Sequence, residues 1–279
     1  MPIYDQSYRP YRGIFSSHTT RWWTITRTGV LHFLKGRKFL VFLTLTFIPP
    51  IVQGFMIYGA HQFPEQKLVT VDAEFFRRML EIQTVWFLVL GIYPGTGLIS
   101  NDLKGNAIQL YLSKPLTRID YVAGKFAILA TFLLGVTFVP GILLFFLELG
   151  FSSDTKFIMS YWWLPLSFAG YALCAATAWG LIVLALSSMS KNSRYVGIML
   201  ISLSFFSSGM AQFMRGIFNR DGIIVISGTD SLKLLTYLFF GGVSEYGDHS
   251  FGAGVALILM SVASVFILRA RVRAVEVVT

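Results

Sequence analysis

Charged residues are scarce in this 279-residue chain: they make up 13% of it, whereas 54% of the residues are hydrophobic and 16% aromatic. A soluble domain usually carries about a quarter charged residues. The deficit extends along the whole sequence, which excludes a soluble domain with a single membrane anchor. The composition therefore predicts an all-α polytopic membrane protein, with residues 1–279 forming one transmembrane domain.

Several kinds of reactive site are also missing. The single cysteine, Cys174, lies in an apolar run and cannot form an intrachain disulfide. The sequence has no phosphate loop of the form G-x-x-x-x-G-K-[ST], and no H-E-x-x-H, C-x-x-C or G-x-S-x-G motif. Its four histidines are scattered, whereas a metal centre needs three or four converging ligands. We therefore expect no catalytic residue, no metal site and no nucleotide site in this chain.

The long apolar runs hold almost no ionisable residues. Glu81 stands at the start of the second run and Glu148 near the end of the third, where interfacial positions are expected. Carriers coupled to protons or ions usually keep an acid, a histidine or a lysine near the middle of the membrane. Secondary transport is therefore disfavoured, and a transporter of this composition must take its energy from elsewhere.

Six apolar runs are long enough to cross a bilayer, which takes about 20 residues. They cover approximately residues 39–59, 82–100, 122–149, 161–189, 195–213 and 251–269. Of the 23 Lys and Arg residues, 16 fall in segments on the N-terminal side of the membrane and 7 on the other side. By the positive-inside rule both termini are cytoplasmic and 214–250 is an extracytoplasmic loop. Its apolar pieces, Ile223 to Ile226 and Leu232 to Phe240, could form short helices that dip into the outer leaflet. The net charge of +9 then suits anionic lipid, and we expect no nucleic-acid partner.

A cytoplasmic arm, residues 1–38, precedes the first span. Between Arg21 and Arg37 the apolar side chains gather on one side of a helical wheel, and Thr26, Leu31 and Arg37 interrupt the pattern. The face includes Trp22, Trp23, Phe33 and Leu34. This pattern predicts an amphipathic helix lying in the membrane interface, with its tryptophans at headgroup depth. An irregular basic arm is the alternative.

Three spans contain polar or flexible positions, and in the fifth these are four serines, Ser202, Ser204, Ser207 and Ser208, with Gln212 near its outer end. The second carries GIYPGTG at 91–97, and the first has Pro49-Pro50 at its middle, where a kink is expected. The polar and flexible positions that could line a path for a large amphiphilic substrate are Tyr93, Pro94, Thr96, Ser204, Ser208 and Gln212. Small and hydroxylated residues also act as simple packing contacts between spans, and this second interpretation stays open.

The polar segment between the second and third spans is too short for a domain and too patterned for a bare turn. Thr117 and Asp120 have the spacing of a helix cap, and Ser113-Lys114-Pro115 reads as a break. We expect a short cytoplasmic helix, a turn, and a helix that enters the third span. Composition alone does not decide between a docking surface for a soluble partner and a solvated loop.

The run from Gly97 to Lys125 resembles the signature of type-2 ABC exporter permeases. In that family an acid and a base follow the second span, then a glycine, leucine-rich turns, a small residue with proline, an arginine, and Gly-Lys at the third span. The matching positions are Asp102, Lys104, Gly105, Leu110, Leu112, Ser113, Pro115, Arg118, Gly124 and Lys125. Six spans and an interfacial helix also match. Asn106 and Ala107 depart from the pattern, because many members have Thr and Leu or Ile there.

This resemblance implies a type-2 ABC exporter permease fold with a coupling helix between spans 2 and 3. It implies a multi-pass protein of the cell (inner) membrane that pairs with a second copy of itself or a homologous permease. Two separate cytoplasmic ABC ATPase subunits would bind ATP and Mg, so this chain itself needs no cofactor. Asp102, Lys104 and Arg118 would make polar contacts with the ATPase, while Leu110, Leu112 and Pro115 would fill a groove in it.

Two other functions share the gross features of the sequence. A membrane enzyme acting on lipids needs clustered acids or histidines at a membrane face, and the nearest candidate is Asp102 with Asp120. A membrane subunit that assembles with other proteins without transporting anything is separated from a permease only by showing substrate movement. The cargo cannot be identified from these residues.

Overall fold

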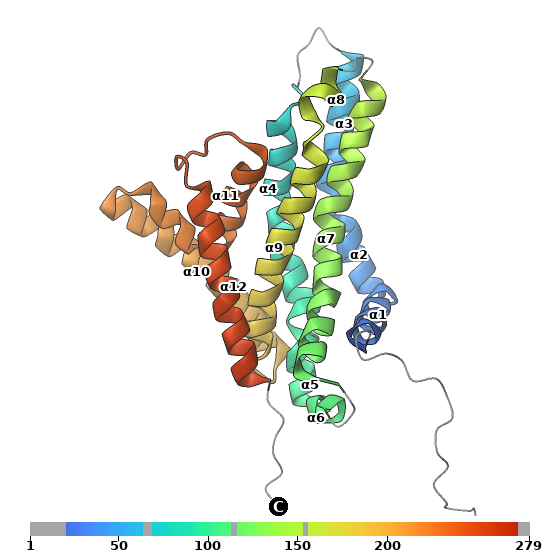
Figure 1. Ribbon diagram of the computed structural model, residues 1–279, viewed down its shortest axis with the longest axis vertical. Coiled ribbons are helices and arrows are strands. Elements are labelled where there is room, and N and C mark those ends of the chain that lie inside the picture. The colour runs from blue at the N-terminus through green and yellow to red at the C-terminus, as the bar shows by residue number, and fades with distance from the viewer. Residues whose placement is uncertain (1–20, 64–68, 113–115, 153–155, 273–279) are drawn as a thin grey trace, which may run out of the picture.

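The computed structural model describes residues 21–63, 69–112, 116–152 and 156–272 (Figure 1). Helices provide the regular structure of these residues, apart from one isolated bridge between Ser244 and Gly247. The helices are α1 (Arg21–Leu34), α2 (Arg37–Leu45), α3 (Ile48–Gln62), α4 (Ala73–Leu90), the π-helix η3 (Gly91–Gly95), α5 (Gly97–Lys104), α6 (Ala107–Leu112), α7 (Arg118–Phe151), α8 (Lys156–Tyr161), α9 (Leu164–Ser187), α10 (Ser193–Phe218), the 3-10 helix η4 (Asp221–Ile226), α11 (Gly228–Phe240) and α12 (Ser250–Arg271).

Six helical stretches among the described residues are long and apolar enough to cross a membrane, which confirms the predicted number of spans. They are Arg37–Gln62, Ala73–Lys104, Arg118–Phe151, Lys156–Ser187, Ser193–Phe218 and Ser250–Arg271. The second begins nine residues before the predicted 82. The additional turns contain the charged residue Arg77, which can be buried there because it has partners. It pairs with Glu81 and lies 4.0 Å over the ring of Tyr237.

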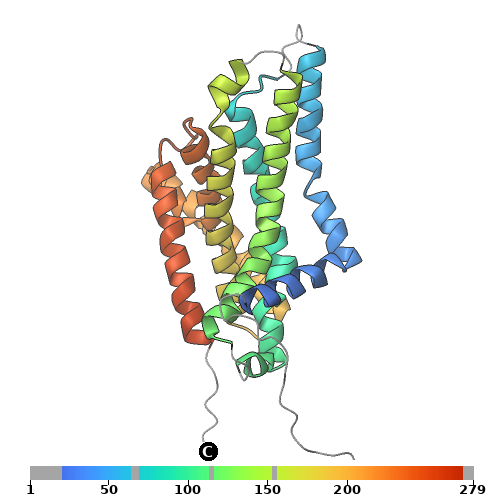
Figure 2. The same ribbon diagram turned by 45° about the vertical axis from the view of Figure 1, so that its right-hand side comes forward.

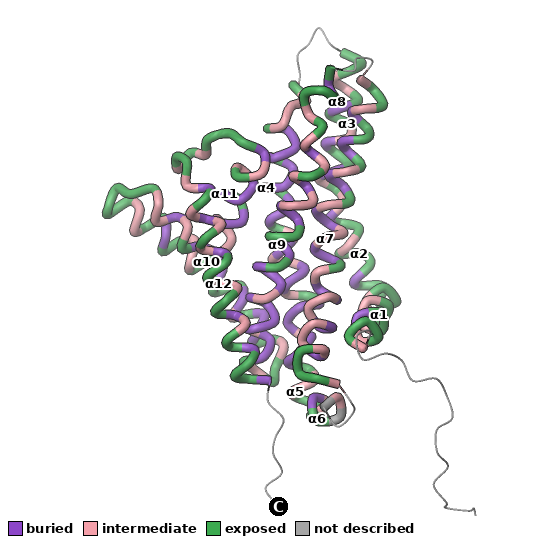
Figure 3. The backbone as a smooth tube through the Cα atoms, in the orientation of Figure 1, coloured by how far each residue is buried: buried purple, intermediate pink, exposed green. Residues whose placement is uncertain are grey.

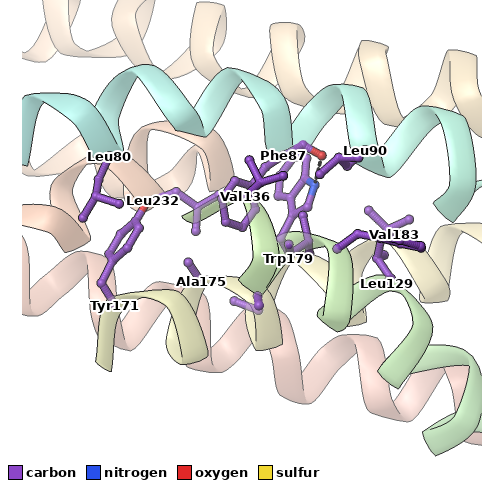
Figure 4. Packing of buried hydrophobic residues seen from close by; sticks show 14 of the residues in the cluster. Leu80, Phe87, Leu90, Leu129, Val136, Tyr171, Ala175, Trp179, Val183 and Leu232 are labelled. Atoms are coloured by element: carbon purple, nitrogen blue, oxygen red, sulfur yellow. Dashed lines mark hydrogen bonds between the residues drawn. The ribbon is translucent and has the colours of Figure 1, made fainter. Parts of the chain in front are cut away.

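The helices α4, α7 and α9 form the centre of the bundle, and buried residues concentrate along them (Figure 3). In the close-up of Figure 4, Leu80, Val136, Tyr171 and Val183 lie at successive positions along the core between these helices. Small residues allow the approach: a Cβ atom on Gly141 of α7 would lie 2.5 Å from the ring of Phe168 in α9. Close backbone contact of this kind is a main source of helix association in lipid.

A single glutamine joins the first three spans. A proline has no N–H, so Pro50 and Pro140 leave the carbonyl groups four residues earlier, at Thr46 and Val136, without a helical donor. The side-chain amide of the fully buried Gln83 donates to both, at 3.1 Å and 3.2 Å. The kink predicted at Pro49-Pro50 appears here as the break between α2 and α3. In lipid, freed backbone groups need partners from neighbouring helices, and Gln83 meets that need.

The segment predicted as the loop 214–250 is largely helical. Helix α10 continues to Phe218, and η4 and α11 then pack back against α12. Gly228, at the start of α11, lies against Met260, which is ten residues and therefore about 15 Å along α12 from its first residue. At its other end, Phe240 contacts Phe168 near the start of α9. The segment therefore enters the bundle and returns.

Helix α10 leans away from the other spans (Figure 1). Apolar side chains on several of its sides are exposed, including Phe205, Phe206, Phe213 and Ile217. Few described residues cover its outer half, and its exposed aromatic side chains are those of Tyr195, Phe205, Phe206, Phe213 and Phe218.

Candidate functional site

The polar segment between the second and third spans forms the lower end of the bundle, where α6 follows α5, the last helix of the second span (Figure 1). Asp102 of α5 is bound within the chain. Its carboxylate lies 2.7 Å from the ammonium of Lys125 and accepts a hydrogen bond of 2.8 Å from the hydroxyl of Tyr121. Both partners belong to the first turns of α7. Asp102 therefore ties the end of the second span to the start of the third.

Aromatic rings attach α6 to the same place. The ring of Tyr111 lies 5.4 Å from that of Tyr121, and the Lys125 ammonium is 5.7 Å and 5.6 Å from the two ring centres. Burial and the nearby Asp102 carboxylate raise the pKa of the Tyr111 phenol, so it stays neutral at physiological pH. Ile108 of α6 is buried as well. The short helix and the two spans can therefore move as one body.

Of the other residues that match the family pattern, three are exposed, two belong to α6 and two lie outside the described residues. Lys104, Gly105 and Arg118 are exposed around α6. Asn106, one of the two departures from the family pattern, has a φ of 51°, a left-handed conformation that asparagine tolerates better than most residues. Leu110 and Leu112 belong to α6, which confirms the short helix, and Ser113 and Pro115 lie outside the described residues.

The predicted helix cap before the third span is present. The Thr117 side chain accepts a hydrogen bond from the backbone N–H of Asp120, whose carboxylate accepts one from the N–H of Thr117. This reciprocal pair fixes where α7 begins. Asp120 is therefore occupied in the cap, and Asp102 is occupied by Lys125, so the two acids do not form a catalytic pair.

The interfacial helix is shorter than predicted: α1 ends at Leu34, and extended backbone at Gly36 separates it from α2. It crosses the lower end of α7 (Figure 2). Trp22, Trp23 and Leu34 are exposed, whereas Phe33 packs against Phe39 and Phe132. The exposed tryptophans suit the predicted position at headgroup depth.

Thr26, which interrupted the apolar pattern, is buried at the contact between α1 and α7. Its hydroxyl lies 3.2 Å from the carbonyl oxygen of Gly124. A Cβ atom at Gly124 would lie 2.8 Å from that of Ile25, so only glycine allows α1 to approach this closely. Both residues of the Gly-Lys pair thus make contacts within the chain: Gly124 allows α1 to pack against α7, and Lys125 forms an ion pair with Asp102.

The GIYPGTG stretch forms the π-helix η3, where the second span changes its hydrogen-bond pattern. Helix α9 supports it from both sides: the Trp179 indole donates to the carbonyl of Phe87 at 2.7 Å (Figure 4). Below the π-helix, the Ser187 hydroxyl donates to the carbonyl of Thr96 and accepts from the N–H groups of Ile99 and Ser100. Single π-helical turns inside α-helices are frequent at functional sites.

The residues expected along a substrate path are not all exposed. Pro94, Thr96 and Ser204 are buried, and the two hydroxyls donate to carbonyls of their own helices. Tyr93 is partly exposed beside Phe39 and Phe42, and Gln212 is exposed on the outer half of α10. Of the residues predicted along the path, Tyr93 and Gln212 are thus accessible on the surface of one copy, and the path itself stays a prediction.

Ser208 belongs to a polar cluster that the sequence did not reveal. Its hydroxyl donates to Asp230 at 2.6 Å and lies 2.8 Å from Ser227 and 3.0 Å from Thr229. Ser227, Thr229 and Asp230 lie where η4 ends and α11 begins. These two helices form a hairpin that packs against α10 and α12. Asp230 lies in the segment expected as an extracytoplasmic loop with short helices, and in the structure Ser227 caps the helix α11 that carries it.

Among the described residues no three His, Cys, Asp or Glu side chains converge as a metal site would require. The described residues thus contain a short helix fastened to the second and third spans, a π-helix within the second span, and an apolar exterior. A comparison with curated proteins gives no match. The model of the family described as "ABC-2 family transporter protein" matches residues 23–268, which is most of the chain and reaches into all six spans. The chain therefore belongs to the ABC-2 transporter family, as a membrane-spanning permease subunit of an ABC transporter.

Proposed function

We propose that this permease exports its cargo with energy from separate ATPase subunits, which dock on α6 and the exposed residues around it. The observation that carries the proposal is the bonding of this end of the molecule. Lys104 and Arg118 are exposed for a partner, while Asp102 and Lys125 fasten the same segment to two spans. A docking element needs both an open face and a firm attachment if it is to move the spans.

The internal bonds suggest how a movement would be transmitted. A displacement of α6 would reach α5 and α7 together through Tyr111 and the Asp102–Lys125 pair. Helix α5 meets α9 at Ser187, directly below the π-helix. Closure of the ATPases would bias one of two packed arrangements of these spans, with η3 taking up the change in backbone angles.

Two copies of the permease, or one copy and a homologue, would complete the transporter. The exposed apolar sides of α3 and α10 would face the second permease or the lipid, and the cargo would pass where the two subunits meet. The protein would lie in the inner membrane of the cell. Both termini and α6 would be on the cytoplasmic side, as the distribution of Lys and Arg favours. ATP and Mg would be bound by the two ATPases.

Purification from native membranes in a mild detergent tests the partnership. We expect a stoichiometric ATPase to accompany the permease and to hydrolyse ATP in a vanadate-sensitive manner. Leu112→Asp and Arg118→Glu should each leave the permease in the membrane but uncouple ATP turnover from transport. Met159→Asp is the matched control, because Met159 is exposed on α8 at the opposite end of the molecule (Figure 1).

Normal transport by a well-expressed Leu112→Asp variant would contradict the docking assignment. A bound ATPase that hydrolyses ATP without any movement of candidate cargo into inverted vesicles would contradict export and favour an assembly role. If no ATPase accompanies the protein in several mild detergents, the partnership itself is wrong.

A further inference from the structure

A cavity of about 230 Å³ lies between α9, α10 and α12, beneath the junction of η4 and α11. We call it the α9–α10–α12 cavity. Its wall includes Trp179 and Ala185 of α9, Leu203 of α10, and Met260 and Ile267 of α12. Thr229, from the start of α11, lies in its roof. The cavity exists because α10 leans away from the bundle while the hairpin bridges the gap above it.

The lining of this cavity is chemically apolar, although it contains hydroxyl groups. Ser204 donates to the carbonyl of Leu200 and Ser264 to that of Met260, each at 2.8 Å within its own helix. Ser207 donates to the carbonyl of Ser204, and Thr229 is part of the Ser208–Asp230 cluster. Every hydroxyl among the described lining residues thus already has a partner within the protein, and apolar cavities stay dry.

The cavity lies at the depth of the hydrocarbon. Gly228 of its roof is next to Met260, about 15 Å inward from the start of α12. Its walls belong to three of the spans. At one side the cavity is open, since Ala263 and Leu203 line it and are nevertheless exposed. That opening lies between α10 and α12, where bilayer chains would be the neighbouring solvent.

We propose that the α9–α10–α12 cavity binds one acyl chain of a bilayer phospholipid, which enters between α10 and α12. A flexible hydrocarbon chain matches the apolar wall, and its methylene groups restore the dispersion contacts that an empty space forfeits. The bound chain fills the space between α10 and its neighbours and so supports the lean of α10. The inference uses only the cavity and the spans, and it does not rest on the ATPase partnership.

Quenching of tryptophan fluorescence by brominated lipid tests this site, because Trp179 is part of its wall. The purified permease is reconstituted in vesicles of dioleoyl phosphatidylcholine and in vesicles of the same lipid brominated on its acyl chains. The contribution of Trp179 is the difference between the unmodified protein and Trp179→Phe. We expect bromine to quench Trp179 although this side chain is buried within the chain.

Ala263→Phe should fill the opening and remove most of the quenching assigned to Trp179. Val262→Phe introduces the same side chain one residue earlier, at an exposed position outside the cavity wall, and should leave it unchanged. Both variants keep all six tryptophans, so their comparison remains decisive if Trp179→Phe fails to assemble. No quenching of Trp179, as in an empty cavity or one covered by a second copy, would overturn the proposal. Equal quenching in the two phenylalanine variants would overturn it as well.

Discussion

In the spans built on α7 and on α9, 61% of the most apolar 18-residue stretch is buried within the chain, whereas the share for α10 is 28%. Hydropathy does not explain the difference, because the span of α12 is as apolar as that of α7 but only 22% buried, whereas the less apolar span of α4 is 56% buried. The difference lies in polar contacts and small residues, since α4, α7 and α9 meet through Gln83, Trp179, Ser187 and Gly141. In lipid the burial of apolar surface drives no association by itself, so such contacts decide which spans form a fixed centre.

Removing the joint at Gln83 should have the largest effect on this centre. Gln83→Leu leaves the carbonyls of Thr46 and Val136 without a donor, and each orphaned buried carbonyl costs about 1–3 kcal/mol. We expect a loss of about 2–5 kcal/mol in stability, measured by thermal unfolding in nanodiscs. Adding Pro140→Ala should recover part of the loss, because the alanine would supply the missing backbone N–H to the carbonyl of Val136.

The matched control for Gln83 is Gln53→Leu on α3. Gln53 is also buried, and the amide oxygens of both glutamines lack a partner among the described residues. Only Gln83 donates to carbonyls that prolines leave free, so Gln53→Leu should cost much less. Equal losses for the two variants would show that the cost comes from side-chain volume and that Gln83 is no special joint.

Breaking the ion pair between Asp102 and Lys125 should cause the second largest loss of stability. Asp102→Asn leaves the largely buried Lys125 without its counter-ion. Breaking a buried ion pair costs about 3–5 kcal/mol, and we expect about 2–3 kcal/mol here because both side chains keep some access to water. The exchanged pair, Asp102→Lys with Lys125→Asp, should restore much of the stability and of the ATP-driven transport. Full stability but no transport in the exchanged pair would instead place Asp102 in direct contact with the ATPase.

The sequence predicted the parts of this molecule that depend on neighbours in the chain. Six apolar runs, the cap at Thr117 and Asp120, and the short helix after the second span all follow from local patterns, and the structure contains them. It did not predict the partner of Asp102, because the two charges come together only when α5 and α7 pack. Short helices are expected from the sequence at 223–226 and 232–240, but not the contact of Asp230 with Ser208, because these two residues meet only when α11 packs against α10.

A third prediction concerns the contact between α1 and α7. Gly124→Val places side-chain atoms where Ile25 already lies, and overpacking of this kind costs about 1–3 kcal/mol. The displaced α1 should become accessible to protease in nanodiscs. Gly135→Val is the control on the same helix, because nothing lies within 4 Å of a Cβ atom there. Should both variants be digested alike, the close approach at Gly124 does not hold α1.

A substitution on α10 should have the smallest effect on folding. It also tests whether lipid or a second copy of the protein covers the exposed aromatic side chains of this helix. Phe206 is 72% exposed, so Phe206→Ala should change the stability of a single copy by less than about 0.5 kcal/mol. If a second copy packs on this surface, the same variant should lower the dimer fraction counted by single-molecule photobleaching in dilute vesicles. The two variants would then have different effects. Gln83→Leu would lower the stability of a single copy, and Phe206→Ala would lower only the association of two copies. An unchanged dimer fraction would mean that lipid alone covers Phe206, and the contact between copies would then have to involve another exposed surface, such as that of α3.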